Sequence, residues 1–99
     1  MKDNALRVNP YDNVVIAIQH IGKGDAVTIG SETLFNTVQD IEPSHKIAVI
    51  AIKSGERVIR YGEPILEAMV DIPKGGWVHV HNAQPIIIPQ QNERKGDRR

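Results

Sequence analysis

Two histidines separated by one residue, His79 and His81, are the pattern in this sequence that most directly suggests chemistry. In a β-strand the side chains of residues i and i+2 point to the same face, so both imidazoles would share a face with Trp77. The valines that alternate with them would be buried on the opposite face. Neutral imidazole binds zinc, copper, iron and nickel, but two ligands are too few for a metal site. The spacing leaves three roles open: metal ligation, hydrogen bonding to another ligand, or structure alone.

Two other pairs of polar residues lie beside expected strands. Asp12 and Asn13 precede an apolar segment, and a turn or cap is the simplest interpretation because such side chains bond to their own backbone. His45 and Lys46 precede a second apolar segment, where a histidine beside a lysine could bind a carboxylate. Charges in loops are usually solvated, so neither pair identifies a site by itself. No catalytic triad, nucleophile elbow or dinucleotide fingerprint is present.

The composition excludes several classes of protein. Among 99 residues, 12 basic and 12 acidic side chains cancel, and no basic stripe with interleaved aromatics indicates nucleic-acid binding. The absence of cysteine excludes disulfides, thiolate metal sites and thiol catalysis. The longest apolar run, residues 47–52, is far shorter than the roughly 20 residues that span a bilayer. No pattern of a secretory signal is visible, so we expect a cytoplasmic protein without membrane or nucleic-acid partners.

A short motif recurs three times, reading Ile-x-(Lys or Ser)-Gly-x-x-Val at residues 21–27, 52–58 and 72–78. Glycine readily adopts positive φ, so each copy predicts a tight turn with glycine at its left-handed position. One apolar residue ends a strand and the next begins another, which resembles a short hairpin loop. The uneven spacing excludes a solenoid and predicts one kind of turn used three times.

The segments between these turns predict short strands. We expect strands over 13–19, 26–29, 32–38, 46–52, 56–61 and 77–82, with 46–52 central because both its faces are apolar. Residues 64–70 fit a strand or a short helix, because Pro64 suits a first helical position. The predicted fold class is a small, mostly β domain of short strands joined by glycine turns, with little helix.

The character of the chain changes at Pro85, so we expect one domain over residues 1–84 and a different segment over 85–99. Residues 85–89 hold three isoleucines between two prolines, which suits an edge or extended segment. We expect this strip to dock on the domain or on a partner. Residues 90–99 contain no apolar side chain and predict a disordered polar tail.

Three segments taken together resemble one enzyme family. They are DNVVIAI (12–18), HKIAVIAIKSGERVIRYGEPI (45–65) and IPKGGWVHVHN (72–82), in family-like order and spacing. The combination resembles the N-terminal domain of the altronate and galactarate dehydratases, which is of the SAF type and has a β-clip fold. Ser44 stands where this family usually has a glycine before its His-Lys pair. The resemblance covers roughly residues 8–83 and implies an SAF-like β-clip.

The resemblance also implies a reaction and partners. The family carries out β-elimination on hydroxy acids, and the related sulfolactate sulfo-lyase, split into small and large subunits, releases sulfite instead of water. A small accessory subunit, or N-terminal domain, is therefore implied, acting on a sugar acid or sulfonated hydroxy acid with a large catalytic subunit that supplies the general base. A divalent metal such as iron or manganese, shared with that subunit, would stabilise the developing enediolate.

Residue by residue, seven positions match the family's motifs and are implied to line a shared site, with His79 and His81 as candidate metal ligands. They are Asp12, Asn13, His45, Lys46, His79, His81 and Asn82. Two interpretations from other classes compete with the lyase. One is a non-catalytic module that binds a carboxylate or metal on the histidine face. The other is a structural or oligomerising module that docks through residues 85–89.

Overall fold

The computed structural model describes residues 3–86, and every regular element in that part of the chain is a β-strand. The strands are β1 (Ala5–Leu6), β2 (Val14–Ala17), β3 (Ala26–Ile29), β4 (Glu32–Asn36), β5 (Lys46–Ala48), β6 (Arg57–Arg60), β7 (Glu63–Ala68), β8 (Trp77–Val78) and β9 (Ala83–Pro85). The predicted mostly β fold is confirmed, and the segment that also fitted a helix is strand β7. Within the described residues there is no helix long and apolar enough to cross a membrane.

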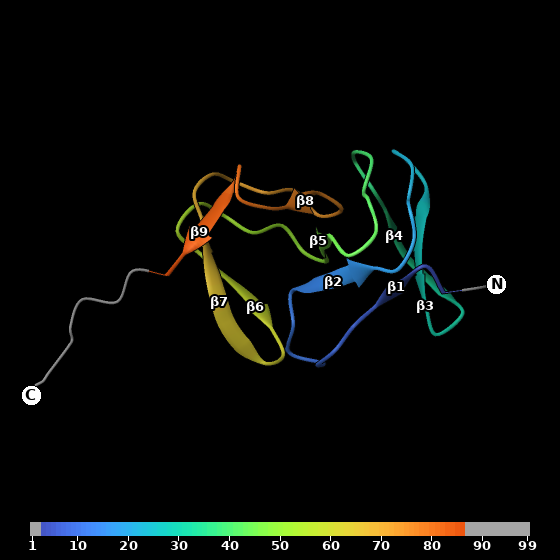
Figure 1. Ribbon diagram of the computed structural model, residues 1–99, viewed down its shortest axis with the longest axis horizontal. Coiled ribbons are helices and arrows are strands. Elements are labelled where there is room, and N and C mark those ends of the chain that lie inside the picture. The colour runs from blue at the N-terminus through green and yellow to red at the C-terminus, as the bar shows by residue number, and fades with distance from the viewer. Residues whose placement is uncertain (1–2, 87–99) are drawn as a thin grey trace, which may run out of the picture.

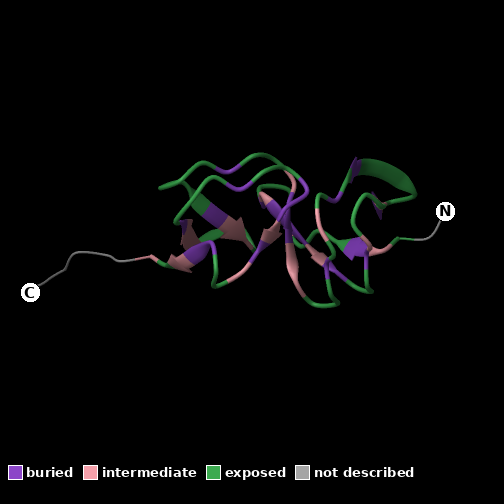
Figure 2. Ribbon diagram, turned by 90° about the horizontal axis from the view of Figure 1, so that it is seen from above, coloured by how far each residue is buried: buried purple, intermediate pink, exposed green. Residues whose placement is uncertain are grey.

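The strands form three small antiparallel sheets. The central sheet has the order β1-β2-β5-β8, β3 pairs with β4, and the third sheet has the order β6-β7-β9. Figure 1 shows the central sheet between the β3–β4 hairpin on one side and the β6-β7-β9 sheet on the other. Most buried residues lie in the strands, although β4 is largely exposed, and most of the loop residues are exposed (Figure 2).

The repeated motif forms the same turn at four places, not three. In each turn a backbone N–H donates to the carbonyl three residues earlier: Asp25 to Gly22, His45 to Glu42, Glu56 to Lys53, and Gly76 to Pro73. The residue before each donor has positive φ, namely Gly24 (85°), Ser44 (74°), Gly55 (89°) and Gly75 (85°). This pattern is typical of a type II turn. The fourth copy, residues 41–47, is hidden in the sequence because Ser44 occupies the glycine position.

These turns do not join paired strands, so the predicted hairpin geometry is wrong. The isoleucines that open the motif pair with one another instead, as isolated bridges between Ile21 and Ile41 and between Ile52 and Ile72. The true hairpins have two-residue loops, Gly30–Ser31 and Tyr61–Gly62, in which all four φ angles are positive. Positive φ at both central residues defines the type I′ turn, whose twist matches that of the flanking strands.

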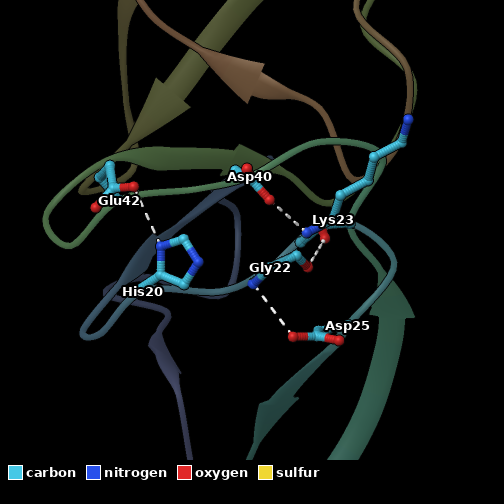
Figure 3. Close-up of polar contacts among 7 residues, drawn as sticks. His20, Gly22, Lys23, Asp25, Asp40 and Glu42 are labelled. Atoms are coloured by element: carbon cyan, nitrogen blue, oxygen red, sulfur yellow. Dashed lines mark hydrogen bonds and ion pairs between the residues drawn. The ribbon is translucent and has the colours of Figure 1, made fainter.

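Acidic side chains close the type II turns. The carboxylate of Asp25 accepts a hydrogen bond from the N–H of Gly22 at 3.2 Å, and that of Asp40 accepts from the N–H of Lys23 at 2.8 Å (Figure 3). The second half repeats both bonds, from Lys53 to Glu56 at 2.8 Å and from Ser54 to Asp71 at 2.9 Å. The side chain of His20 lies 3.1 Å from the carboxylate of Glu42 (Figure 3).

The two halves of the domain are one structural unit repeated after 31 residues (52 − 21 and 72 − 41, from the paired isoleucines). The same shift relates other backbone bonds: the N–H of Gly24 donates to Thr37 and that of Gly55 to Ala68. Each half has its own apolar core. The first contains Ala5, Val15, Ala17, Ile21, Val27, Phe35, Ile41 and Ile47, and the second contains Val14, Ala48, Ile52, Val58, Ala68, Ile72, Val78 and Ala83.

Two strands end four residues earlier than predicted. The central strand β5 ends at Ala48, not at residue 52, and β8 ends at Val78, not at residue 82. Val80 is consequently 76% exposed, so the expectation that it is buried beside Val78 is wrong. The expected boundary after residue 84 falls inside β9, and the predicted tail over residues 90–99 lies outside the described part.

Candidate functional site

Three histidines gather around the single tryptophan of the chain. The ring centroids of His45, His79 and His81 lie 5.1, 4.9 and 4.8 Å from that of Trp77, and those of His45 and His79 lie 5.3 Å apart. His45 and His79 are nearly parallel to the indole, with interplanar angles of 8° and 14°. We call these four side chains the ring cluster. Centroid separations of this size are typical of stabilising aromatic pairs.

The strand pairing of β5 with β8 brings the two parts of the ring cluster together. Ile47 is opposite Trp77 in this pair, so His45 lies on the same face of the sheet as the indole. Trp77 in turn packs against the first core. The ring cluster therefore covers the edge of that core at the surface.

A tight loop after β8, rather than strand alternation, places the other two histidines. The side chain of Asn82 accepts a hydrogen bond from the N–H of His79 at 2.9 Å and donates one to the carbonyl of Trp77 at 2.7 Å. Its own N–H donates to the carbonyl of His79. Asn82 is buried, and both polar groups of its side chain are used in this loop. Asn82 thus positions the histidines of the ring cluster.

The ring cluster presents imidazoles at the surface. His45 and His79 are half-buried and His81 is exposed. The indole Nε1 of Trp77 is buried and has no hydrogen-bond partner. Within residues 3–86, no group of three or more His, Cys, Asp or Glu side chains could hold a metal ion. His79 and His81 would therefore need ligands from elsewhere to form a metal site.

Lys46 does not join the ring cluster, although it follows His45 directly. Successive residues of a strand point to opposite faces, so Lys46 lies with its strand partners Ile16 and Val78 on the side of the second core. Burial lowers the pKa of the half-buried Lys46 ammonium, and the nearby charge of Arg60 lowers it further. The structure thus places Lys46 beside a second cation on a different face from the histidines.

Arg60 is a candidate residue that sequence reasoning missed. It ends β6, and its guanidinium carbon lies 4.7 Å from the ring centre of Tyr61. Its Nε is buried without a hydrogen-bond partner. Alternation along the strand predicts that Val58 and Arg60 share a face, but only the three-dimensional packing brings that face beside Lys46.

Asp12 and Asn13 fasten the hairpin that carries Arg60. Asp12 is only 4% exposed, and its carboxylate accepts hydrogen bonds from the N–H groups of Gly62 (2.8 Å) and Asn9 (3.2 Å). The side chain of Asn13 accepts from the N–H of Ile59 at 2.7 Å and donates to the carbonyl of Arg57 at 2.9 Å. Their polar atoms are therefore engaged with backbone groups, but apart from the bond of Asp12 to Asn9 these groups belong to a distant hairpin and not to a local turn, which the turn-or-cap interpretation did not predict.

The first half uses the same device. Asp3 accepts a hydrogen bond from the N–H of Ser31 at 3.1 Å, and Asn4 bonds to the backbone of Thr28 and Ala26 at 2.9 and 2.8 Å. The residues contacted, Ser31 and Gly62, are again 31 positions apart. The Asp-Asn dipeptide is therefore a repeated part of the scaffold.

Comparison with known proteins defines the class. Residues 3–85 match the family model of the altronate/galactarate dehydratase SAF domain. The match covers most of the chain, and the all-strand architecture agrees with it. This chain belongs to the altronate/galactarate dehydratase SAF-domain family.

Three relatives share this domain, and the chain matches a different share of each of them. It is 35% identical over 79 residues to altronate dehydratase of Escherichia coli (strain K12), which covers 80% of this chain and 16% of that protein. It is 30% identical over 87 residues to galactarate dehydratase (L-threo-forming) of the same strain, which covers 86% of this chain and 15% of that protein. It is 44% identical over 45 residues to (2R)-sulfolactate sulfo-lyase subunit alpha of Paracoccus pantotrophus, which covers 46% of this chain and 67% of that protein. The chain thus spans about one sixth of the dehydratases it matches.

Proposed function

We propose that this chain is the small accessory component of a lyase that eliminates water or sulfite from a hydroxy acid. Another subunit, or another domain, would supply the large catalytic part. The observation that carries the proposal is the pattern of coverage. The matched region is 16% of altronate dehydratase but 67% of a protein named as a subunit of sulfolactate sulfo-lyase. The same domain therefore belongs both to long dehydratases and to a subunit of a related lyase.

The surface position of the candidate residues supports a shared site. His81 is exposed, and His45 and His79 are half-buried at the surface. A carboxylate, a leaving hydroxyl or a partner's side chain could therefore meet these imidazoles directly. In this proposal the ring cluster provides hydrogen-bonding and acid–base groups at the rim of a site, and the general base that removes the α-proton comes from the large part.

A divalent metal at this shared site is a further part of the proposal. His79 and His81 would provide two imidazole ligands, and the large part would provide the others. When bound, the metal would supply positive charge for the developing enediolate. Metal analysis of the chain alone and of the purified assembly tests this. Metal retained only by the assembly, and lost with His79→Ala/His81→Ala, is the expected result; a metal content unchanged by the double substitution would contradict it.

Reconstitution tests the lyase proposal directly. The chain would be co-expressed with the product of the adjacent open reading frame, and the pair assayed for formation of a keto acid from altronate and galactarate and for release of sulfite from sulfolactate. We expect no turnover by the chain alone and turnover by the complex. Full activity of the isolated chain would contradict the accessory role. A stable complex that binds but never converts these acids would favour the non-catalytic binding module instead.

A further inference from the structure

The 31-residue repeat allows the two cores to be compared position by position. The corresponding pairs are Ala17 and Ala48, Ile21 and Ile52, Val27 and Val58, Ile41 and Ile72, and Ile47 and Val78. Each pair keeps an apolar side chain, and most keep the same residue. The backbone frame therefore imposes the same packing on both halves.

Among the core positions that break this correspondence, two change from apolar to charged. In the first half, Val15 is fully buried and Ile29 packs against the same core. The residues 31 positions later are Lys46 and Arg60. The strand registers agree with this equivalence: Val15 is opposite Ile47 and Lys46 opposite Val78, while Ile29 is opposite Glu32 and Arg60 opposite Glu63. An apolar pair in one half is thus a pair of cations in the other.

Within the part of the chain that the structure describes, the two cations have no carboxylate partner. The only ion pair among residues 3–86 is that of His20 with Glu42. Glu63, which faces Arg60 across the hairpin, forms no ion pair with it. The Nε of Arg60 is buried without any hydrogen-bond acceptor, while its guanidinium is held against the ring of Tyr61. A buried donor and two adjacent positive charges are unfavourable unless an anion compensates them.

The scaffold itself does not require these charges. The first half shows that the same backbone accepts two apolar residues at these positions. Burial and the charge of Arg60 both lower the pKa of Lys46, as expected when two like charges are brought together out of water. The cations therefore make the fold less stable than an apolar pair would, which points to a role in binding.

We infer that Lys46 and Arg60 form a binding site for the carboxylate of a small organic acid. The guanidinium of the half-buried Arg60 offers a charge-assisted hydrogen bond to one carboxylate oxygen, and the ammonium of Lys46 offers a second. Asp12 and Asn13 act as positioning residues, because they fix the hairpin that carries Arg60. The site lies on the face of β5 opposite His45. The proposed function enters this inference at one point only, the choice of a hydroxy acid as the ligand to be tested.

An NMR titration of the full 99-residue chain tests this without any catalytic partner. The Arg60 Nε–H resonance would be followed while galactarate is added, with galactitol, the uncharged polyol of the same length, as the control. Galactarate is expected to shift this resonance in a saturable way and galactitol to leave it unchanged. Equal shifts from both compounds, or none from galactarate, would overturn the inference. Absence of a shift with galactarate overturns the inference even if an assembled enzyme later proves to depend on Arg60. In that case the guanidinium would pair with a carboxylate of the partner protein and not with a small acid.

Substitution by the residues of the first half separates binding from folding. In Lys46→Val/Arg60→Ile we expect galactarate affinity to fall by roughly tenfold or more, since charged hydrogen bonds are lost, while the melting temperature rises. Arg57→Gln, on the exposed part of the same strand, is the matched control and should bind as the wild type does. Lower stability of the double variant, or unchanged affinity, would show that the cations are structural. Absence of lyase activity in any assembly would refute the proposed function, but it would not change what the titrations show about carboxylate binding by Lys46 and Arg60.

Discussion

Asn82 donates a hydrogen bond to the carbonyl of Trp77 across 2.7 Å, and this bond closes the loop that holds two histidines against the indole. The same side chain accepts from the N–H of His79. Asn82 belongs to the same family motif as His79 and His81, but unlike them it is buried. Its contribution to a site is made through the geometry of the loop.

Asn82→Ala should therefore loosen the loop and disturb the ring cluster. Two hydrogen bonds are lost and two backbone groups left without partners, which costs about 1–3 kcal/mol of unfolding free energy. Trp77 is the only tryptophan, so its fluorescence reports the change directly. We expect an altered emission spectrum and a lower urea midpoint. Gln84→Ala, on β9, is the control, and an unchanged spectrum for Asn82→Ala would contradict the positioning role.

Gly75 and Gly55 provide a matched pair for testing backbone approach. Both have nearly the same φ, 85° and 89°, but a Cβ on Gly75 would clash with the carbonyl oxygen of Asn36, whereas nothing lies within 4 Å of one on Gly55. Gly55→Ala should cost about 1 kcal/mol from positive φ alone. Gly75→Ala should cost at least about 3 kcal/mol or prevent folding, because backbone must move. Equal urea midpoints for the two variants would rule out the close contact.

Asp12→Ala tests whether this carboxylate is structural. Removing it leaves the N–H groups of Gly62 and Asn9 without their acceptor, and we expect a loss of about 2 kcal/mol, measured by thermal or urea unfolding. Asp3→Ala, its exposed counterpart in the first half, should cause a much smaller loss. A variant of Asp12 with wild-type stability and no activity in the assembly would instead assign it to substrate.

Lys46 gives the stability of the domain a defined dependence on pH. Its pKa is lowered by folding, so the unfolded chain binds this proton more tightly than the folded chain does. Stability should therefore rise with pH between the lowered pKa and the ordinary value of 10.5. Lys46→Met should be more stable than the wild type at neutral pH and lack this rise. Urea unfolding of both proteins across the alkaline range measures it, and parallel curves would be inconsistent with a perturbed lysine.

Much of the fold follows from local patterns. The left-handed glycines Gly24, Gly55 and Gly75 and the strand character of the intervening segments are predicted because turn geometry and alternation act over a few residues. The pairing of these turns cannot be predicted in this way, because the bridge between Ile21 and Ile41 joins residues far apart in the sequence. The early end of β8 also escapes prediction, because it depends on the tertiary hydrogen bonds of Asn82.

The candidate site divides in the same way. The histidine pattern identifies His79 and His81 but assigns them to a strand, whereas a loop brings them to Trp77. Arg60 carries no motif and is found only through its buried, unpartnered Nε and its neighbour Lys46. An alignment of the sequence with itself, shifted by 31 residues, would have revealed Arg60, because it places this arginine at the position of the apolar Ile29. Ser44 at the glycine position of the fourth turn conceals that alignment.

The repeated unit also makes the domain prone to exchanging halves between molecules. The halves pair through β2 and β5 and are joined further by the bonds of Asp12 and Asn13 to the β6–β7 hairpin, and both halves have the same turns, hairpins and bridges. If the chain opens between Val49 and Ala51, a second molecule can supply the missing half with the same hydrogen bonds. A swapped dimer would then differ from the monomer mainly in chain entropy, so protein concentration would set the balance between them.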